Sequence, residues 1–330
     1  MLKGCGTILL CFLLHTATQQ LWGQNPPLAS PQPTPPSLAA PDASVPGTTC
    51  AQLQQTSSKL IEQRKYSQVT GVLEQSLALC PNRREILLVL AKAQMLSKQF
   101  PAALASLNAL ISEDPKNVDA LMTQGKVFYL LNKDAEADAS LRRAIEIAPK
   151  ASEPHYTLGR LYYAQSNVKD ATTQFQAALK LDPNAYKAYD GLALCYETSG
   201  KISEAAHEYM SGLALVYKAY PSYDVIYADF AEFLLRYGSN KKAFDLAAEA
   251  ASRNPREPRN FYLAGKALYE GGHLEASVPW LERSILINPL YPDPHNILAR
   301  VYRRLGKSDQ ANQEARTFQK LLEKAPAITR

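Results

Sequence analysis

Residues 118–149 read VDALMTQGKVFYLLNKDAEADASLRRAIEIAP, and residues 152–183 read SEPHYTLGRLYYAQSNVKDATTQFQAALKLDP. Aligned on their final prolines, the two stretches carry the same classes of residue at the same places, with the pairs Gly125 and Gly159, Ala137 and Ala171, Leu141 and Phe175, and Pro149 and Pro183. Small residues allow two helices to cross closely, and large ones fill the gaps between neighbouring turns. The pattern therefore predicts a packed pair of helices that repeats along the chain.

Prolines continue this repeat in both directions. Their spacing is 34 residues, except for 38 before the fifth and 37 before the last, in the series Pro81, Pro115, Pro149, Pro183, Pro221, Pro255, Pro289 and Pro326. A proline lacks the backbone N–H that a continuing helix requires, so each one separates two helices. A fixed period of this length is typical of an array of stacked helical hairpins.

One unit of the array is longer than the others. The four additional residues before Pro221 correspond to about one helical turn, so the second helix of this unit should project further. Tyr217, Tyr220 and Tyr223 gather at its expected end. We favour packing as the reason for these tyrosines over a binding patch.

These units resemble the tetratricopeptide repeat family from residue 50 to about residue 325. The resemblance implies an all-α, right-handed α-solenoid of about eight helical hairpins. The expected units are about 50–83, 84–117, 118–151, 152–185, 186–223, 224–257, 258–291 and 292–325, followed by a tail at 326–330.

The residues before the array have a different character. Residues 1–23 combine a basic start at Lys3 with a short apolar run at 8–14, which is typical of a secretory signal peptide cleaved after Gly23. Residues 24–49 contain eight prolines and predict an extended linker, although they could also be a ligand for a proline-binding groove. We therefore expect an exported protein, periplasmic or secreted, with no transmembrane segment in the mature chain.

Three cysteines remain after removal of the signal peptide: Cys50, Cys80 and Cys195. In a helical hairpin the start of the first helix lies beside the end of the second, and these are the places of Cys50 and Cys80. Because an exported protein reaches an oxidising compartment, we expect a Cys50–Cys80 disulfide, with two unpaired thiols as the alternative. Cys195 is interpreted as a core thiol.

Composition and motifs indicate a folded protein without catalytic machinery. The chain is 46% hydrophobic and 20% charged, and its net charge of +5 comes from 36 basic and 31 acidic residues, which does not suggest a nucleic-acid partner. Phosphate-binding loops and zinc or nucleophile motifs are absent from the sequence. His155 and His295 are interpreted as core or rim aromatics. We expect a non-enzyme with no cofactor and no metal.

The resemblance implies that the first helix of each unit lines a concave groove. The groove residues that it indicates are Lys92, Lys126, Tyr129, Tyr156, Arg160, Tyr163, Tyr262, Lys266, Tyr269 and Arg300. Acidic residues are expected to interrupt this basic row at Asp190, Glu197, Asp229 and Glu232, with Arg259 beginning its return. The alternative is a solvated helix face that only keeps the protein soluble.

The function that follows is a non-catalytic protein–protein interaction scaffold of the cell envelope. Its groove would hold an extended anionic partner, because focused basic charge attracts such a chain and tyrosine supplies rigid contact area. The alternative function is a periplasmic component of an exopolysaccharide-secretion machine that binds an acidic glycan. An enzyme is the residual third possibility.

Overall fold

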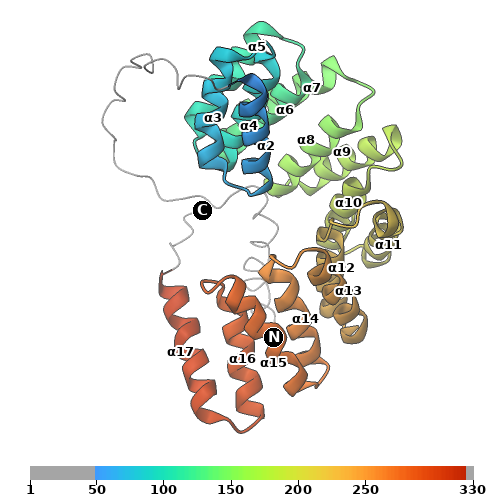
Figure 1. The fold of residues 1–330 in the computed structure, drawn as a ribbon. Helices are drawn as coiled ribbons and strands as arrows, with labels where there is room; N and C mark the ends of the chain where they lie inside the picture. The colour runs from blue at the N-terminus through green and yellow to red at the C-terminus, as the bar shows by residue number, and fades with distance from the viewer. Residues whose placement is uncertain (1–48, 325–330) are drawn as a thin grey trace. The chain divides into compact units, whose positions relative to one another are not determined.

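The computed structural model describes residues 49–324, which contain sixteen α-helices and no strands (Figure 1). The prediction of an all-α array of helical hairpins is confirmed. No helix in the described range has the length and apolar character needed to cross a membrane. The predicted signal peptide, the predicted linker up to residue 48 and the tail lie outside the described residues.

The helices form two compact units, and the first of them ends at Asp182. Consecutive helices pack in pairs into four hairpins. In each hairpin we call the earlier helix the first helix and the later one the second helix. The helices of this unit are α2 (Cys50–Glu62), α3 (Tyr66–Leu79), α4 (Arg83–Leu96), α5 (Phe100–Glu113), α6 (Val118–Leu130), α7 (Asp134–Ile147), α8 (Ser152–Ala164) and α9 (Val168–Leu181).

The second unit begins at Pro183 and has the same plan. Its helices are α10 (Tyr186–Thr198), α11 (Ile202–Ala219), α12 (Val225–Arg236), α13 (Asn240–Arg253), α14 (Pro258–Glu270), α15 (Leu274–Ile287), α16 (Pro292–Arg304) and α17 (Ser308–Lys324). Pro279 lies inside α15, which continues without a break through it.

Each hairpin turns through one residue with a left-handed backbone. In the first unit these residues are Arg64, Lys98, Asn132 and Ser166, and in the second they are Gly200, Gly238, Gly272 and Gly306. Glycine adopts a positive φ without a steric cost, whereas in other residues the Cβ atom then crowds the following carbonyl oxygen. The turns therefore repeat along the chain as the prolines do. Only the second unit has glycine, the least strained residue, at these turn positions.

Close helix crossing explains the glycines of the repeat. A Cβ atom added to Gly159 would lie 2.9 Å from the ring of Phe175, and one added to Gly125 would lie 2.7 Å from Leu141. Phe175 and Leu141 are themselves fully buried. The small residue of the first helix thus makes room for the large residue of the second helix, as the sequence pattern predicts.

The additional residues of the fifth hairpin lengthen its second helix, as predicted. α11 has 18 residues, whereas the second helices α3, α5, α7, α9, α13 and α15 have 14 each. The ring of Tyr220 lies 4.1 Å from that of Tyr186 between centroids, and the Tyr223 hydroxyl donates to Asp190 over 3.4 Å. Packing accounts for these two tyrosines, whereas Tyr217 is largely exposed.

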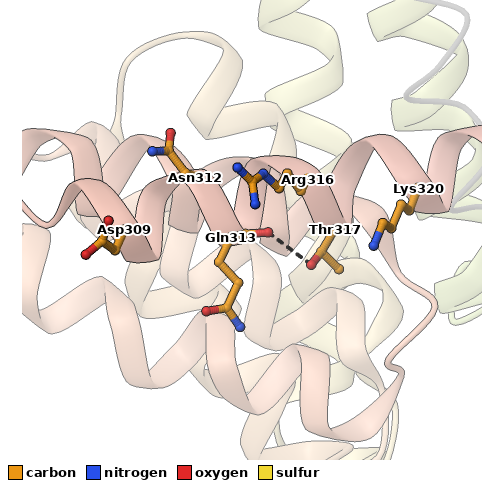
Figure 2. Close-up of a pocket in the computed structure, with 6 residues that line it drawn as sticks. All are labelled: Asp309, Asn312, Gln313, Arg316, Thr317 and Lys320. Carbon is orange, nitrogen blue, oxygen red and sulfur yellow. Dashed lines mark hydrogen bonds between the residues drawn. The ribbon is translucent and has the colours of Figure 1, made fainter.

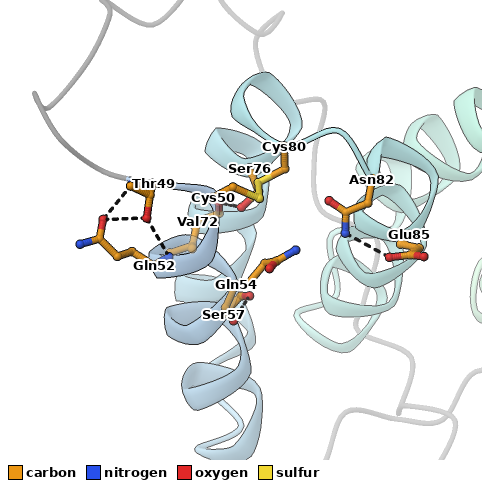
Figure 3. The surroundings of a disulfide bond; sticks show 10 residues. All are labelled: Thr49, Cys50, Gln52, Gln54, Ser57, Val72, Ser76, Cys80, Asn82 and Glu85. Atoms are coloured by element: carbon orange, nitrogen blue, oxygen red, sulfur yellow. Dashed lines mark hydrogen bonds between the residues drawn. A yellow bond between two sulfur atoms is a disulfide. The ribbon is translucent and has the colours of Figure 1, made fainter.

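A disulfide joins Cys50 and Cys80 at the open end of the first hairpin (Figure 3). Their Cα atoms are 5.3 Å apart, within the usual range for such a bond.

Beside the disulfide, Thr49 caps α2, although the sequence assigns this residue to the linker. Its hydroxyl accepts a hydrogen bond from the Gln52 amide, and its own amide donates to the Gln52 side chain over 2.7 Å. This reciprocal pair is a capping box, which fixes where the helix begins.

Candidate functional site

The basic row of the first unit lies on three neighbouring helices. Lys92, Lys126 and Arg160 occupy the same place in α4, α6 and α8, and each of these helices packs against the next. The side chain of Lys92 is 47% exposed, and its ammonium lies 4.0 Å from the carboxylate of Asp119. Lys126 and Arg160 are partly exposed. The structure thus brings together the three cations that the sequence predicts for one surface.

Tyrosine side chains lie near the last member of this row. The guanidinium of Arg160 lies 5.9 Å from the centroid of the Tyr156 ring and donates to the Tyr156 hydroxyl over 3.5 Å. Burial raises the pKa of Tyr129, the carboxylate of Asp134 raises it further, and the charge of Arg160 opposes both effects. Tyr129, Tyr156 and Tyr163 each keep part of their surface exposed. These rings can contact a partner without leaving their packed positions.

An acidic row that the sequence analysis did not anticipate runs parallel to the basic one. Glu85, Asp119 and Glu153 are exposed and lie in the first turns of α4, α6 and α8. Negative side chains are stabilising there because the amino end of a helix carries partial positive charge. Their equal spacing of 34 residues was visible in the sequence and could have revealed them.

The groove residues predicted for the second unit are placed differently. Tyr262 and Tyr269 are only 7% and 9% exposed, so their rings offer little surface to a partner. The guanidinium of Arg300 lies 5.1 Å from the Tyr269 centroid and that of Arg304 lies 5.5 Å away, while Lys266 lies 3.9 Å from the Glu270 carboxylate. These side chains contact one another or neighbouring side chains of the same unit.

Burial of an ion network corrects the interpretation of the middle of the groove. Arg259 was expected on a basic surface, but its side chain is 12% exposed and pairs with Asp229 at 2.6 Å and with Glu232 at 2.5 Å. Arg236 links Glu232 to Glu197. Burial raises the pKa of Glu197, against the charge of Arg236. The expected acidic surface is therefore largely neutralised inside the fold.

Two histidines, His155 and His295, take part in polar pairs between helices. The Nδ1 of His155 lies 2.8 Å from the Gln174 side-chain oxygen, and that of His295 lies 2.6 Å from a Glu314 carboxylate oxygen. His295 is buried and His155 is half-buried, in agreement with the expectation of core or rim positions. Among residues 49–324, no cluster of three or more metal-ligating side chains is found.

A shallow hollow of about 460 Å³ lies on α17, and all of its lining comes from that helix (Figure 2). Its side chains are polar, and they are Asp309, Asn312, Gln313, Arg316, Thr317 and Lys320. A polar outer face is what a terminal element of a repeat array requires for solubility. The side chains of a single helix do not enclose a ligand, so this face is not a candidate site.

Sequence comparison identifies the repeats. Three sequence models, each described as tetratricopeptide repeat, match residues 60–125, 119–151 and 156–224. A comparison with curated protein sequences found no significant match.

Several solved structures are similar in fold. A chain of the APC/C hetero-tetramer Cut9-Hcn1 is 14% identical, with a TM-score of 0.62 over 83% of this chain and 53% of that one. Yeast Tom70 is 15% identical, with a TM-score of 0.58 over 80% of this chain and 56% of that one. Pseudomonas aeruginosa pilF is 15% identical, with a TM-score of 0.55 over 65% of this chain and 95% of that one. The chain thus spans about half the length of the first two. With its hairpins, its turns and its matching sequence models, this chain belongs to the tetratricopeptide repeat family.

Proposed function

We propose that this protein is a non-catalytic scaffold that holds an extended acidic segment of a partner protein along α4, α6 and α8. The observation that carries the proposal is the row of Lys92, Lys126 and Arg160 on three helices that pack side by side. Tetratricopeptide repeats bind protein partners, and a repeated surface suits a partner that is itself extended.

The acidic row does not cancel this attraction. Lys92 and Glu85 are seven residues apart on one face of α4, which corresponds to about 10 Å along the helix axis. The Debye length at physiological salt is about 8 Å, so a partner carboxylate in contact with the basic row is largely screened from the acidic row on its own helix. Lys92 also lies near Asp119 of the next helix, so a partner carboxylate would have to compete with Asp119 for the Lys92 ammonium. Arg160, beside Tyr156, offers a different contact, because the ring adds rigid surface at a low entropic cost.

We also propose that the protein acts after export, in the cell envelope. The charged start, the short apolar run and the small residue at Gly23 support a signal peptide. The Cys50–Cys80 disulfide supports an oxidising compartment, because disulfides persist there and are rare in reducing cytosol. A protein that is exported and binds in a groove fits an assembly role in the envelope.

Charge reversal of the basic row tests the proposed function. The variant Lys92→Glu, Lys126→Glu, Arg160→Glu is expected to weaken binding of a 15-residue polyglutamate peptide at least about tenfold, since each exposed ion pair contributes on the order of 0.5–1 kcal/mol. Isothermal titration at low and physiological salt measures this effect. The proposal also requires the wild-type affinity to fall as salt is added.

A second triple variant controls for the change in total charge. Lys116→Glu, Lys150→Glu, Lys169→Glu alters exposed lysines of the same unit outside α4, α6 and α8 and changes the net charge equally. Equal loss in both variants, or no binding of the peptide by the wild type, would contradict the proposal. Tighter binding of polygalacturonate than of polyglutamate would favour the acidic glycan instead.

A further inference from the structure

A third row of side chains lies beside the basic one on the same three helices. It is apolar and aromatic, and it consists of Met95, Leu96, Tyr129, Leu130 and Tyr163 at the carboxyl ends of α4, α6 and α8. Leu96 is 51% exposed, and the other four are partly exposed. An aligned set of such residues on neighbouring helices exceeds the scattered apolar exposure of an ordinary surface.

The apolar row and the basic row are close enough for one chain to cover both. Tyr129 follows Lys126 by three residues and Leu130 follows it by four, so both lie within about 6 Å of it along the axis of α6. On each helix the acidic residue lies seven residues before the basic one, on the side away from the apolar row, although Asp119 reaches Lys92 of the neighbouring helix. A segment laid across the helices would therefore meet cations along one edge and apolar surface along the other.

The corresponding places of the second unit differ. At the place of Tyr129, Leu235 and Tyr269 are only 6% and 9% exposed. The place of Leu96 and Leu130 is charged on the first helices of the last three hairpins. It is occupied by Arg236 on α12, Glu270 on α14 and Arg304 on α16. Arg236 and Glu270 are held in ion pairs, and the guanidinium of Arg304 lies over the Tyr269 ring. The combination of an apolar row with a basic row is thus a property of the first unit.

We propose that the partner segment is amphipathic, with apolar side chains at every third residue and acidic residues between them. This inference rests on the proposed function, because it specifies the ligand of the same groove. Packed helices are about 8–10 Å apart, and three residues of a polyproline-II-like chain advance about 9 Å. Each apolar side chain of such a segment would meet the next helix, while its carboxylates face Lys92, Lys126 and Arg160. An acidic polysaccharide has no side chains that would cover Leu96.

Three 15-residue peptides test the pattern on the full-length protein. One repeats Leu-Glu-Glu five times, the second has the same composition with all five leucines in one block, and the third contains only glutamate. We expect the repeating peptide to bind about tenfold more tightly than the all-glutamate peptide and more tightly than the block peptide. Isothermal titration measures all three under identical salt conditions.

Two single substitutions locate the contact. Leu96→Asn is expected to remove the advantage of the repeating peptide and to leave the binding of the all-glutamate peptide unchanged. Leu79→Asn is the matched control, because Leu79 is 58% exposed and, like Leu96, is the last residue of its helix, but lies on the second helix α3. It should change the affinity of neither peptide.

The outcomes separate this inference from the function on which it rests. If the all-glutamate peptide binds and the repeating peptide has no advantage, or if Leu96→Asn changes nothing, the amphipathic partner is wrong while the acidic groove remains. If no peptide binds the wild type, the proposed function itself fails. A preference for the block peptide would contradict the proposed spacing.

Discussion

Replacing Arg259 by alanine should lower the free energy of unfolding by about 3–5 kcal/mol, because two buried carboxylates lose their counterion. Asp229 and Glu232 both pair with the Arg259 guanidinium, and the Asp229 side chain is almost fully buried. Urea denaturation at pH 7.5 measures the loss. Arg256→Ala is the matched control: Arg256 is an exposed arginine three residues earlier, and its removal should change stability by less than about 0.5 kcal/mol.

The pH dependence identifies the cause. Burial alone would raise the pKa of Glu232, but Arg259 holds it below its usual value. In the wild type the ionised Glu232 carboxylate, paired with Arg259, contributes to stability at pH values above the pKa of a glutamate in the unfolded chain. This contribution is lost as the pH falls through the lower pKa of Glu232 in the folded protein. Without Arg259, burial raises the folded pKa, so the destabilisation grows as pH rises above about 4.3. The difference from wild type should therefore be smaller at pH 5 than at pH 7.5. An equal difference at both values would contradict the charge argument.

Loss of the Cys50–Cys80 disulfide should destabilise the first hairpin by about 3–4 kcal/mol in the chain-entropy model for a loop of about 30 residues. The double variant Cys50→Ser, Cys80→Ser tests this. Hydrogen exchange should accelerate in α2 and α3, which form one end of the described array and have a repeat on one side only. Exchange in α12 to α14 should remain unchanged.

Reductant provides the control for this experiment. It should reproduce the effect in the wild type and have no effect on the double-serine variant. Peptide mapping of the purified protein without reductant should recover Cys50 and Cys80 in one linked pair. Free thiols at both positions would contradict the disulfide and remove its support for an oxidising compartment.

The arrangement of helices was predictable because it repeats. A proline every 34 residues, with Gly159 opposite Phe175 in one unit and Gly125 opposite Leu141 in another, specifies a helical hairpin locally. The longer α11 was predictable for the same reason, because an insertion of one helical turn keeps the faces of the helix in phase. Repetition turns a weak local pattern into a strong one.

The state of the groove residues was less predictable because it depends on contacts between hairpins. Repeat position alone gives Tyr129 and Tyr269 the same place in their units, yet Tyr269 is buried beneath Arg300 and Arg304. Arg259 is similarly drawn inward by Asp229 and Glu232 on α12, and no spacing within its own unit reveals those partners. The apolar row containing Leu96 was present in the sequence, but its exposure became evident only from the packed helices.

The groove of α4, α6 and α8 can be tested most directly by photo-crosslinking. A 15-residue polyglutamate peptide with a central benzophenone would be bound to the full-length protein, irradiated, and the adducts located by mass spectrometry. Adducts should concentrate in residues 83–96, 118–130 and 152–164, and should disappear in the Lys92→Glu, Lys126→Glu, Arg160→Glu variant. Adducts concentrated in α5, α7 and α9 or in residues 183–324, or unchanged in that variant, would contradict a binding groove on the first helices of the first unit.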